Sequence, residues 1–256
     1  MSTKPLFRNN FLTVFIIFSA LFVLESQAIE KLVNDHIEKI QGVAFDKDKK
    51  IFYTETSTLS FQHDKIERID TSYKAEDGQL MAELHADLKK SSSLPDIQMK
   101  DHRDQYEYKI VYLADENKVE VSQKENGKSE WSSKKIPYTE NMTNSVGLMM
   151  YIQNHAVELQ KLKKKVFRYI IPSRQDDYGM VVEFVSEREH LLNYTFKMEN
   201  ALLRSIVGGG ESHLQIDQKN FRITQFEGIS NLLDQKDHSV EIILTYQSVD
   251  LKAEPK

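Results

Sequence analysis

Apolar and polar side chains alternate along most of this chain, and this period of two constrains the fold more than any other feature. The segment 51–61 is typical, because one of its rows is rich in threonine while the other carries Ile51, Tyr53, Leu59 and Phe61. Segment 80–88 places its leucines and alanines on a single face, which we expect to be buried, with Met81, Glu83, His85 and Asp87 on the wetter face. The first half therefore predicts about six consecutive antiparallel strands, at 51–61, 65–74, 80–88, 106–112, 119–121 and 131–136.

Turn residues separate these segments. Glu76-Asp77-Gly78 and Asn126-Gly127 are typical of tight hairpins, and 91–101, which contains Pro95, reads as a connection. After residue 165 the pattern continues with a loop at 176–179 and a connection at 227–237. Further strands are predicted there at 166–171, 180–186, 191–198, 202–207, 213–216, 221–226 and 240–246. Because helices and strands do not alternate, most parallel nucleotide-binding folds are excluded.

Asn144–Lys165 is the one long segment after the N-terminus that predicts an amphipathic helix. Asn144 or Ser145 can serve as its N-cap, and lysines gather at its end, where the helix dipole favours cations. Its apolar face must cover a sheet. We therefore predict a mainly β (α+β) fold, a long curved antiparallel sheet or incomplete β-barrel, with this helix at about 144–165 as its cover.

The N-terminus predicts export. Lys4 and Arg8 precede an apolar run at 11–24, and Ser26 and Ala28 match the small residues that signal peptidase recognises. We predict a signal peptide at 1–28 and a single β-rich domain at 29–256, beginning with a short helix at 29–40. The run is too short to span a bilayer comfortably, so no stable membrane span is expected after cleavage; anchoring in the inner membrane by an uncleaved segment is the alternative.

Composition removes several classes of function. The chain has no cysteine, which excludes disulfides, thiol catalysis and lipid attachment at the cleavage site. Its net charge of −5 makes nucleic acid an unexpected partner. No zinc-protease, phosphate-loop, dinucleotide or serine-elbow motif is present, and the eight histidines are scattered singly. We therefore expect no cofactor, no metal site and no catalytic residue.

One polar cluster leaves two interpretations open. Asp101-His102-Arg103-Asp104 could bind an anion, or it could be a strand-entry turn with a local ion pair, which is the commoner case. An enzyme would need these residues to share a pocket with Glu55 or Glu83.

Several short segments together resemble a family of uncharacterised exported proteins of Gram-negative bacteria. They are Phe52-Tyr53-Thr54-Glu55, Ser72-Tyr73 with Asp77-Gly78, Leu94-Pro95-Asp96, Asp101-His102-Arg103, Phe226–Asn231, Val240-Glu241-Ile242 and Tyr246. The resemblance implies a periplasmic location. At the level of architecture, the expected fold is also similar to the lipoprotein carriers of the periplasm, whose half-barrel holds acyl chains beneath helices.

Two functional hypotheses follow. In the first, the protein binds or carries a lipid or other hydrophobic ligand, held by the helix face over the sheet through Leu148, Met149, Ile152 and Leu159. In the second, it is an interaction or assembly protein of the cell envelope that binds a protein partner through its sheet face or an edge strand.

Overall fold

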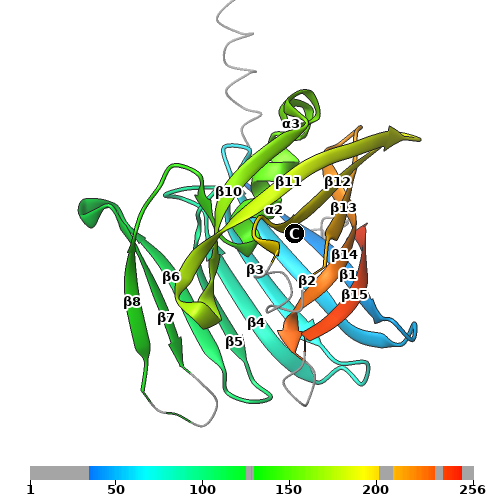
Figure 1. Ribbon diagram of the computed structural model, residues 1–256. Coiled ribbons are helices and arrows are strands. Elements are labelled where there is room, and N and C mark those ends of the chain that lie inside the picture. The colour runs from blue at the N-terminus through cyan, green and yellow to red at the C-terminus, as the bar shows by residue number, and fades with distance from the viewer. Residues whose placement is uncertain (1–34, 125–127, 129, 202–209, 234–238, 250–256) are drawn as a thin grey trace, which may run out of the picture.

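The computed structural model describes residues 35–124, 128, 130–201, 210–233 and 239–249. One continuous sheet of fifteen strands contains every strand of these residues (Figure 1). The predicted signal peptide, the Asn126-Gly127 turn and the predicted strand at 202–207 lie outside the described residues.

The sheet joins two meanders through its first and last strands. β1 pairs with β2 on one side and with β15 on the other, and all neighbours are antiparallel except β9 and β10. The spatial order is β8-β7-β6-β5-β4-β3-β2-β1-β15-β14-β13-β12-β11-β10-β9. The strands are β1 (His36–Asp46), β2 (Ile51–Gln62), β3 (Lys65–Lys74), β4 (Leu80–Asp87), β5 (Asp96–Asp101), β6 (Glu107–Leu113), β7 (Lys118–Lys124), β8 (Ser132–Pro137), β9 (Met142–Thr143), β10 (Lys164–Ile171), β11 (Asp176–Arg188), β12 (Leu191–Met198), β13 (Ser212–Asp217), β14 (Arg222–Leu233) and β15 (Ser239–Val249).

The sheet curves until its two ends face each other, but it does not close into a barrel (Figure 1). Side chains bridge the gap instead of a backbone ladder. The 3-10 turn η2 (Pro172–Arg174) leads to Gln175, whose Nε2 donates to the carbonyl of Ser132 at 2.7 Å and to that of Val121 at 3.1 Å. Lys134 of β8 pairs with Asp176 of β11 at 2.9 Å. The predicted mainly β, incomplete barrel is therefore confirmed.

The predicted single helix at 144–165 is two shorter helices, α2 (Ser145–Asn154) and α3 (Ala156–Leu162). His155 leaves helical geometry; its ring stacks on Tyr151 with the centroids 4.1 Å apart, and its Nδ1 lies 3.0 Å from the Tyr151 carbonyl. The predicted end of the helix at Lys165 was also wrong. The helix ends at Leu162, because Lys163 has a φ of 64° and Lys164 and Lys165 pair with β11 as part of β10.

The start of α2 is fixed to the sheet by Asn144, which is buried and is the N-cap, one of the two candidates predicted. Its Oδ1 accepts from the backbone N–H of Gly147 at 2.9 Å, and its Nδ2 donates to the carbonyl of Pro95 at 2.8 Å. Gly147 packs so closely that a Cβ there would lie 2.1 Å from the Ser93 carbonyl oxygen. This contact sets α2 on the concave side of the sheet.

Three other sequence predictions were wrong because the conformation of each segment depends on the strands that it pairs with, which the local sequence does not show. The predicted helix at 29–40 is strand β1 from His36 onward, hydrogen-bonded on both sides, and residues 29–34 lie outside the described part. The connection at 91–101 contains β5, which pairs with β4 and β6. The loop at 176–179 is the start of β11. In addition, β14 extends to Leu233, into the segment predicted as a connection, and the first half holds eight strands, β1 to β8, where about six were predicted.

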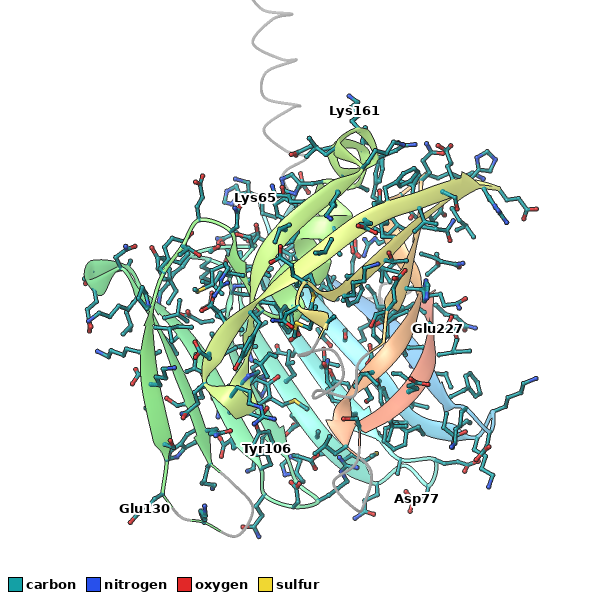
Figure 2. All side chains as sticks on the ribbon, viewed as in Figure 1. Lys65, Asp77, Tyr106, Glu130, Lys161 and Glu227 are labelled. Atoms are coloured by element: carbon teal, nitrogen blue, oxygen red, sulfur yellow. The ribbon has the colours of Figure 1, made fainter. Side chains whose placement is uncertain are left out.

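Buried side chains form two clusters, one in each part of the curved sheet. The first is built mainly on β1 to β8, and the second lies between the helices and β10 to β13. Within β4, Ala82, Leu84 and Ala86 are buried as predicted, while His85 and Asp87 on the other face are exposed. The prediction was wrong at the start of the strand, where Leu80 is exposed and Met81 is buried next to an irregularity in the β3–β4 ladder. Charged side chains such as Lys161 and Glu227 lie on the outside of the molecule (Figure 2).

Candidate ligand cavity

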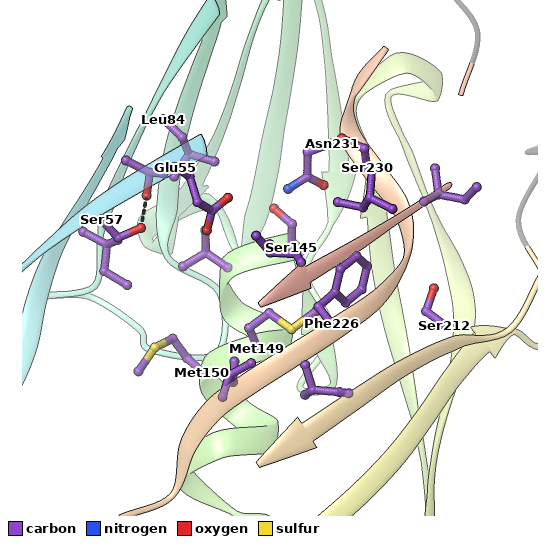
Figure 3. Close-up of a pocket in the computed structure, with 18 of the residues that line it drawn as sticks. Glu55, Ser57, Leu84, Ser145, Met149, Met150, Ser212, Phe226, Ser230 and Asn231 are labelled. Carbon is purple, nitrogen blue, oxygen red and sulfur yellow. Dashed lines mark hydrogen bonds between the residues drawn. The ribbon is translucent and has the colours of Figure 1, made fainter. Parts of the chain in front are cut away.

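A cavity of about 1600 Å³ lies on the concave side of the sheet. Strands of both meanders line it, and Ser145, Met149 and Met150 of α2 contribute to its wall (Figure 3). In the same view Glu55 and Ser57 of β2 face Ser230 and Asn231 of β14 across the space. Because α2 is anchored through Asn144, it forms one wall of this cavity.

Most of the lining is apolar. Alternation along each strand turns one row of side chains into the cavity, and these rows are aliphatic or aromatic on nearly every strand. Representative members are Leu59, Ile69, Leu84, Ile97, Ile110, Ile170, Leu214, Phe226, Ile242 and Leu244. Such a surface favours an apolar occupant over water.

A polar row interrupts this apolar wall, and we call it the Glu55 row. It consists of Tyr73, Glu55, Gly42 and Tyr246, which stand directly opposite one another on the adjacent strands β3, β2, β1 and β15. Directly opposed residues project from the same face of a sheet, so Tyr73, Glu55 and Tyr246 point into the same cavity. Residues that are far apart in the sequence thus form one continuous polar strip.

Gly42 leaves room for this row. A Cβ at that position would lie 2.8 Å from Leu244 Cδ1, 2.9 Å from Glu55 Cγ and 3.2 Å from Tyr246 Cε1. Without a side chain at Gly42, the ring of Tyr246 extends over β1, and its hydroxyl hydrogen-bonds to the carboxyl of Glu55.

Burial controls the electrostatics of the row. Glu55 is 7% exposed, and removal from water raises the pKa of its carboxyl to about 7, although the hydrogen bond from Tyr246 acts in the opposite direction. Burial, followed by the nearby Glu55 carboxyl, raises the pKa values of Tyr53, Tyr73 and Tyr246 well above the ordinary value for tyrosine. The tyrosines are therefore neutral hydrogen-bonding groups at physiological pH, while Glu55 is poised between its two states.

The opposite wall supplies further polar groups where β14 departs from regular pairing. The ladder between β14 and β15 is interrupted between Ile229 and Leu233, and such irregularities re-aim side chains. Ser230 and Asn231 of this interruption hydrogen-bond to Tyr53 and Tyr73, respectively. On the Glu55 side, Ser57 and Thr71 hydrogen-bond to each other at 2.8 Å (Figure 3).

The four residues predicted to bind a ligand divide between two environments. Met149 lines the cavity, but Leu148, Ile152 and Leu159 are at most 2% exposed and belong to the second core cluster. Their face of the helices packs on β10 to β13, where the hydroxyl of Tyr194 donates to the carbonyl of Ala156 at 2.7 Å. The side of α2 that carries Ser145, Val146 and Met149 faces the cavity instead.

The polar cluster Asp101–Asp104 is a structural turn, and its members make contacts in different places. Arg103 Nε donates to Asp101 Oδ1 at 2.9 Å, and Arg103 Nη1 donates to the carbonyl of Leu233, which ties this turn to the end of β14. His102 pairs with Glu83 at 2.9 Å, outside the cavity lining. Asp104 does line the cavity. Among the described residues, Asp104 is thus the member of this cluster that shares the cavity with Glu55, and His102 is the one that meets Glu83.

Sequence reasoning named Glu55 only as a conceivable acid and missed the rest of its row. A signal was available, because Glu55 and Ser57 stand in the same alternating row as Tyr53 and Leu59, which the structure buries. Burying a polar side chain costs free energy unless it is hydrogen-bonded, so polar residues inside an otherwise buried row are candidates for a site.

Within the described ranges, no group of three or more histidine, aspartate or glutamate side chains is arranged to hold a metal ion. None of the helices in that part of the chain combines the length and hydropathy needed to cross a membrane.

No protein-family model and no curated protein matches this chain. Among solved structures it is similar to a β-barrel-like protein of the domain of unknown function DUF1849 from Brucella abortus, with a TM-score of 0.38 and 11% sequence identity. That match covers 84% of this chain and 98% of the other.

Proposed function

We propose that this protein is a non-catalytic binding or carrier protein for a lipid or another hydrophobic ligand, and that it is exported to the periplasm. The observation that carries the proposal is the cavity of about 1600 Å³ with a mostly apolar lining. Typical small-molecule pockets measure roughly 300–1,000 Å³, so this cavity has room for a long-chain molecule. Transfer of an alkyl chain from water contributes about 0.8 kcal/mol per buried methylene group.

The arrangement of the wall supports a carrier role. The sheet is unclosed, and the side chains of Gln175 and Lys134 join its two parts, so the wall can open locally without breaking a continuous backbone ladder. The helix α2 belongs to the same wall, and a small displacement of Met149 would change the room available to a ligand. Carriers need such a route for loading and release.

The chemistry of the lining favours binding over catalysis. The Glu55 carboxyl lies beside Tyr246 and near Tyr53 and Tyr73. The raised pKa values of these tyrosines keep their hydroxyls protonated, and protonated hydroxyls are poor nucleophiles and poor bases. Hydrogen bonds of this kind orient a ligand, while the apolar remainder of the wall provides affinity.

The proposal is tested by purifying the full chain after export in a bacterial host and identifying the molecules extracted from it by mass spectrometry. We expect lipids or other long-chain molecules in a fixed ratio to protein. A preparation without any extractable apolar molecule, combined with a reproducible protein partner captured by crosslinking in cells, would favour an envelope assembly role instead.

A further inference from the structure

When Glu55 is ionised, the Glu55 row has a charge that the described cavity wall leaves uncompensated. Buried carboxylates are ordinarily paired with a cation, because removal from water is otherwise costly. The pKa of Glu55 responds to burial and to Tyr246, with no contribution from a lysine or arginine. The row therefore lacks a cationic partner among the described residues.

The lysine and arginine side chains that line the cavity either pair with other carboxylates or lie on the opposite side of their strand from Glu55. Arg222 forms an ion pair with Glu38, and Lys197 pairs with Glu183 and Glu211. Lys39 lies three residues from Gly42 on β1, so alternation places it on the opposite side of the strand, and it is exposed.

The groups around the carboxyl are those by which proteins recognise ammonium ions. Aromatic rings attract cations through their faces, and tyrosines combined with a carboxylate are a recurrent arrangement for amines and quaternary ammonium groups. Tyr53 and Tyr73 meet edge to face with their ring centroids 5.4 Å apart, and Tyr246 borders Glu55 from the other side. Three rings thus surround one carboxyl beside a large apolar space.

We propose that the Glu55 row binds the ammonium group of an amphiphile, either an alkylamine or a lipid with an amine-containing head group, whose chain occupies the apolar cavity. This inference rests on the proposed ligand-binding function and specifies its ligand class. An anionic head group would face the carboxyl without a compensating cation, and a neutral one would leave the ionised carboxyl unpaired.

A series of ten-carbon probes tests the inference, because its members differ only in the head group. Decylamine, decyltrimethylammonium, decanol and decanoate would each displace the neutral fluorophore N-phenyl-1-naphthylamine from the full chain at pH 8, below their micellar concentrations. Both cationic probes are expected to bind at least about tenfold more tightly than decanol, which corresponds to about 1.4 kcal/mol. Decanoate is expected to bind most weakly.

Two variants test whether the preference for cationic probes arises from the Glu55 row. Glu55→Gln should remove the advantage of the cations over decanol, and Glu241→Gln, on an exposed position of β15, should preserve it. If Glu55→Gln fails to fold, proton release provides a second measurement on the unchanged protein. At pH 6 Glu55 is mostly protonated, so binding of decyltrimethylammonium should release a proton, detected by calorimetry in buffers of different ionisation enthalpy, whereas decanol should release none.

The outcomes separate the two proposals. Equal binding of decanol and the cations, a cation preference that survives Glu55→Gln, or an absence of proton release would overturn the ammonium site while leaving a hydrophobic carrier in place. Failure of every probe to displace the fluorophore would overturn both. To distinguish the two sources of ammonium, vesicles containing phosphatidylethanolamine would be compared with vesicles of phosphatidylglycerol alone: selective extraction of the former indicates a lipid head group, and binding of decylamine without extraction indicates a free amine.

Discussion

The hydroxyl of Tyr246 on β15 reaches the carboxyl of Glu55 on β2 across β1, the strand between them. This contact exists because the residue of β1 that lies directly between the two is Gly42. It couples the second and last strands of the described chain, β2 and β15, at the place where a ligand would lie. The consequences for stability and for binding can be measured separately.

The raised pKa of Glu55 predicts a loss of stability with increasing pH. Below about pH 4.5 the carboxyl is protonated in both the folded and the unfolded chain; between there and about pH 7 the folded chain binds more protons, so the free energy of unfolding falls. The loss attributable to this group approaches about 3 kcal/mol above pH 7, from 1.36 kcal/mol per pKa unit. Glu55→Gln should remove it, as measured by urea unfolding at pH 5 and pH 8.5. Parallel pH profiles for Glu55→Gln, Glu241→Gln and the unchanged protein would contradict this assignment.

Gly42→Ala should destabilise the protein by about 1–3 kcal/mol, the usual cost of inserting a methyl group into a packed site. The new methyl group would collide with Leu244, Glu55 and Tyr246, and it would separate the last two. Gly210→Ala is the matched control, because no atom lies within 4 Å of its Cβ position. Thermal unfolding compares the two, and equal effects would mean that the close approach over β1 is unimportant.

Asn144→Ala should cost about 2 kcal/mol, because it removes an N-cap and leaves the buried carbonyl of Pro95 without its donor. Since Asn144 fixes α2 to the sheet, amide exchange in α2 should accelerate more than exchange in β2. Asn141→Ala, at an exposed position nearby, provides the comparison. Unchanged exchange in α2 would show that the helix is held mainly by its apolar contacts.

Met149→Trp should reduce binding of N-phenyl-1-naphthylamine by about tenfold or more, since the larger side chain would occupy space inside the cavity. Val157→Trp introduces the same residue at an exposed position of α3 and should have no effect. A fluorescence titration of both variants measures the difference. Equal affinities would place the fluorophore outside the cavity.

The sequence predicted the structure best where a pattern within a single segment determines the conformation. The alternation in β4 predicted the buried face from Ala82 onward, although not at Leu80 and Met81, and Asn144 was one of the two residues predicted as helix N-cap. Strand β1 and strand β5 were missed because their conformation depends on partners on both sides, which no local pattern reveals. Likewise, the break at His155 depends on its stacking with Tyr151.

The candidate site was less predictable than the fold, because it arises from register. Gly42, Glu55, Tyr73 and Tyr246 become neighbours only when four strands are aligned. The apolar helix positions gave a mixed result for the same reason: Met149 and Leu148 are adjacent in the sequence, yet one lines the cavity and the other packs in the core. Which of two apolar faces borders empty space is a property of the assembled sheet.

The methionines allow the most direct test of the central claim, that an apolar molecule enters the cavity. In the described chain Met149, Met150, Met180 and Met198 line it, whereas Met81, Met99 and Met142 are buried elsewhere. With ¹³C-methyl-labelled methionine, a titration with decanol followed by NMR should shift the four lining signals along one saturable curve and leave the other three in place. If the lining signals stay unchanged at saturating decanol, or all seven shift alike, the cavity is not the binding site.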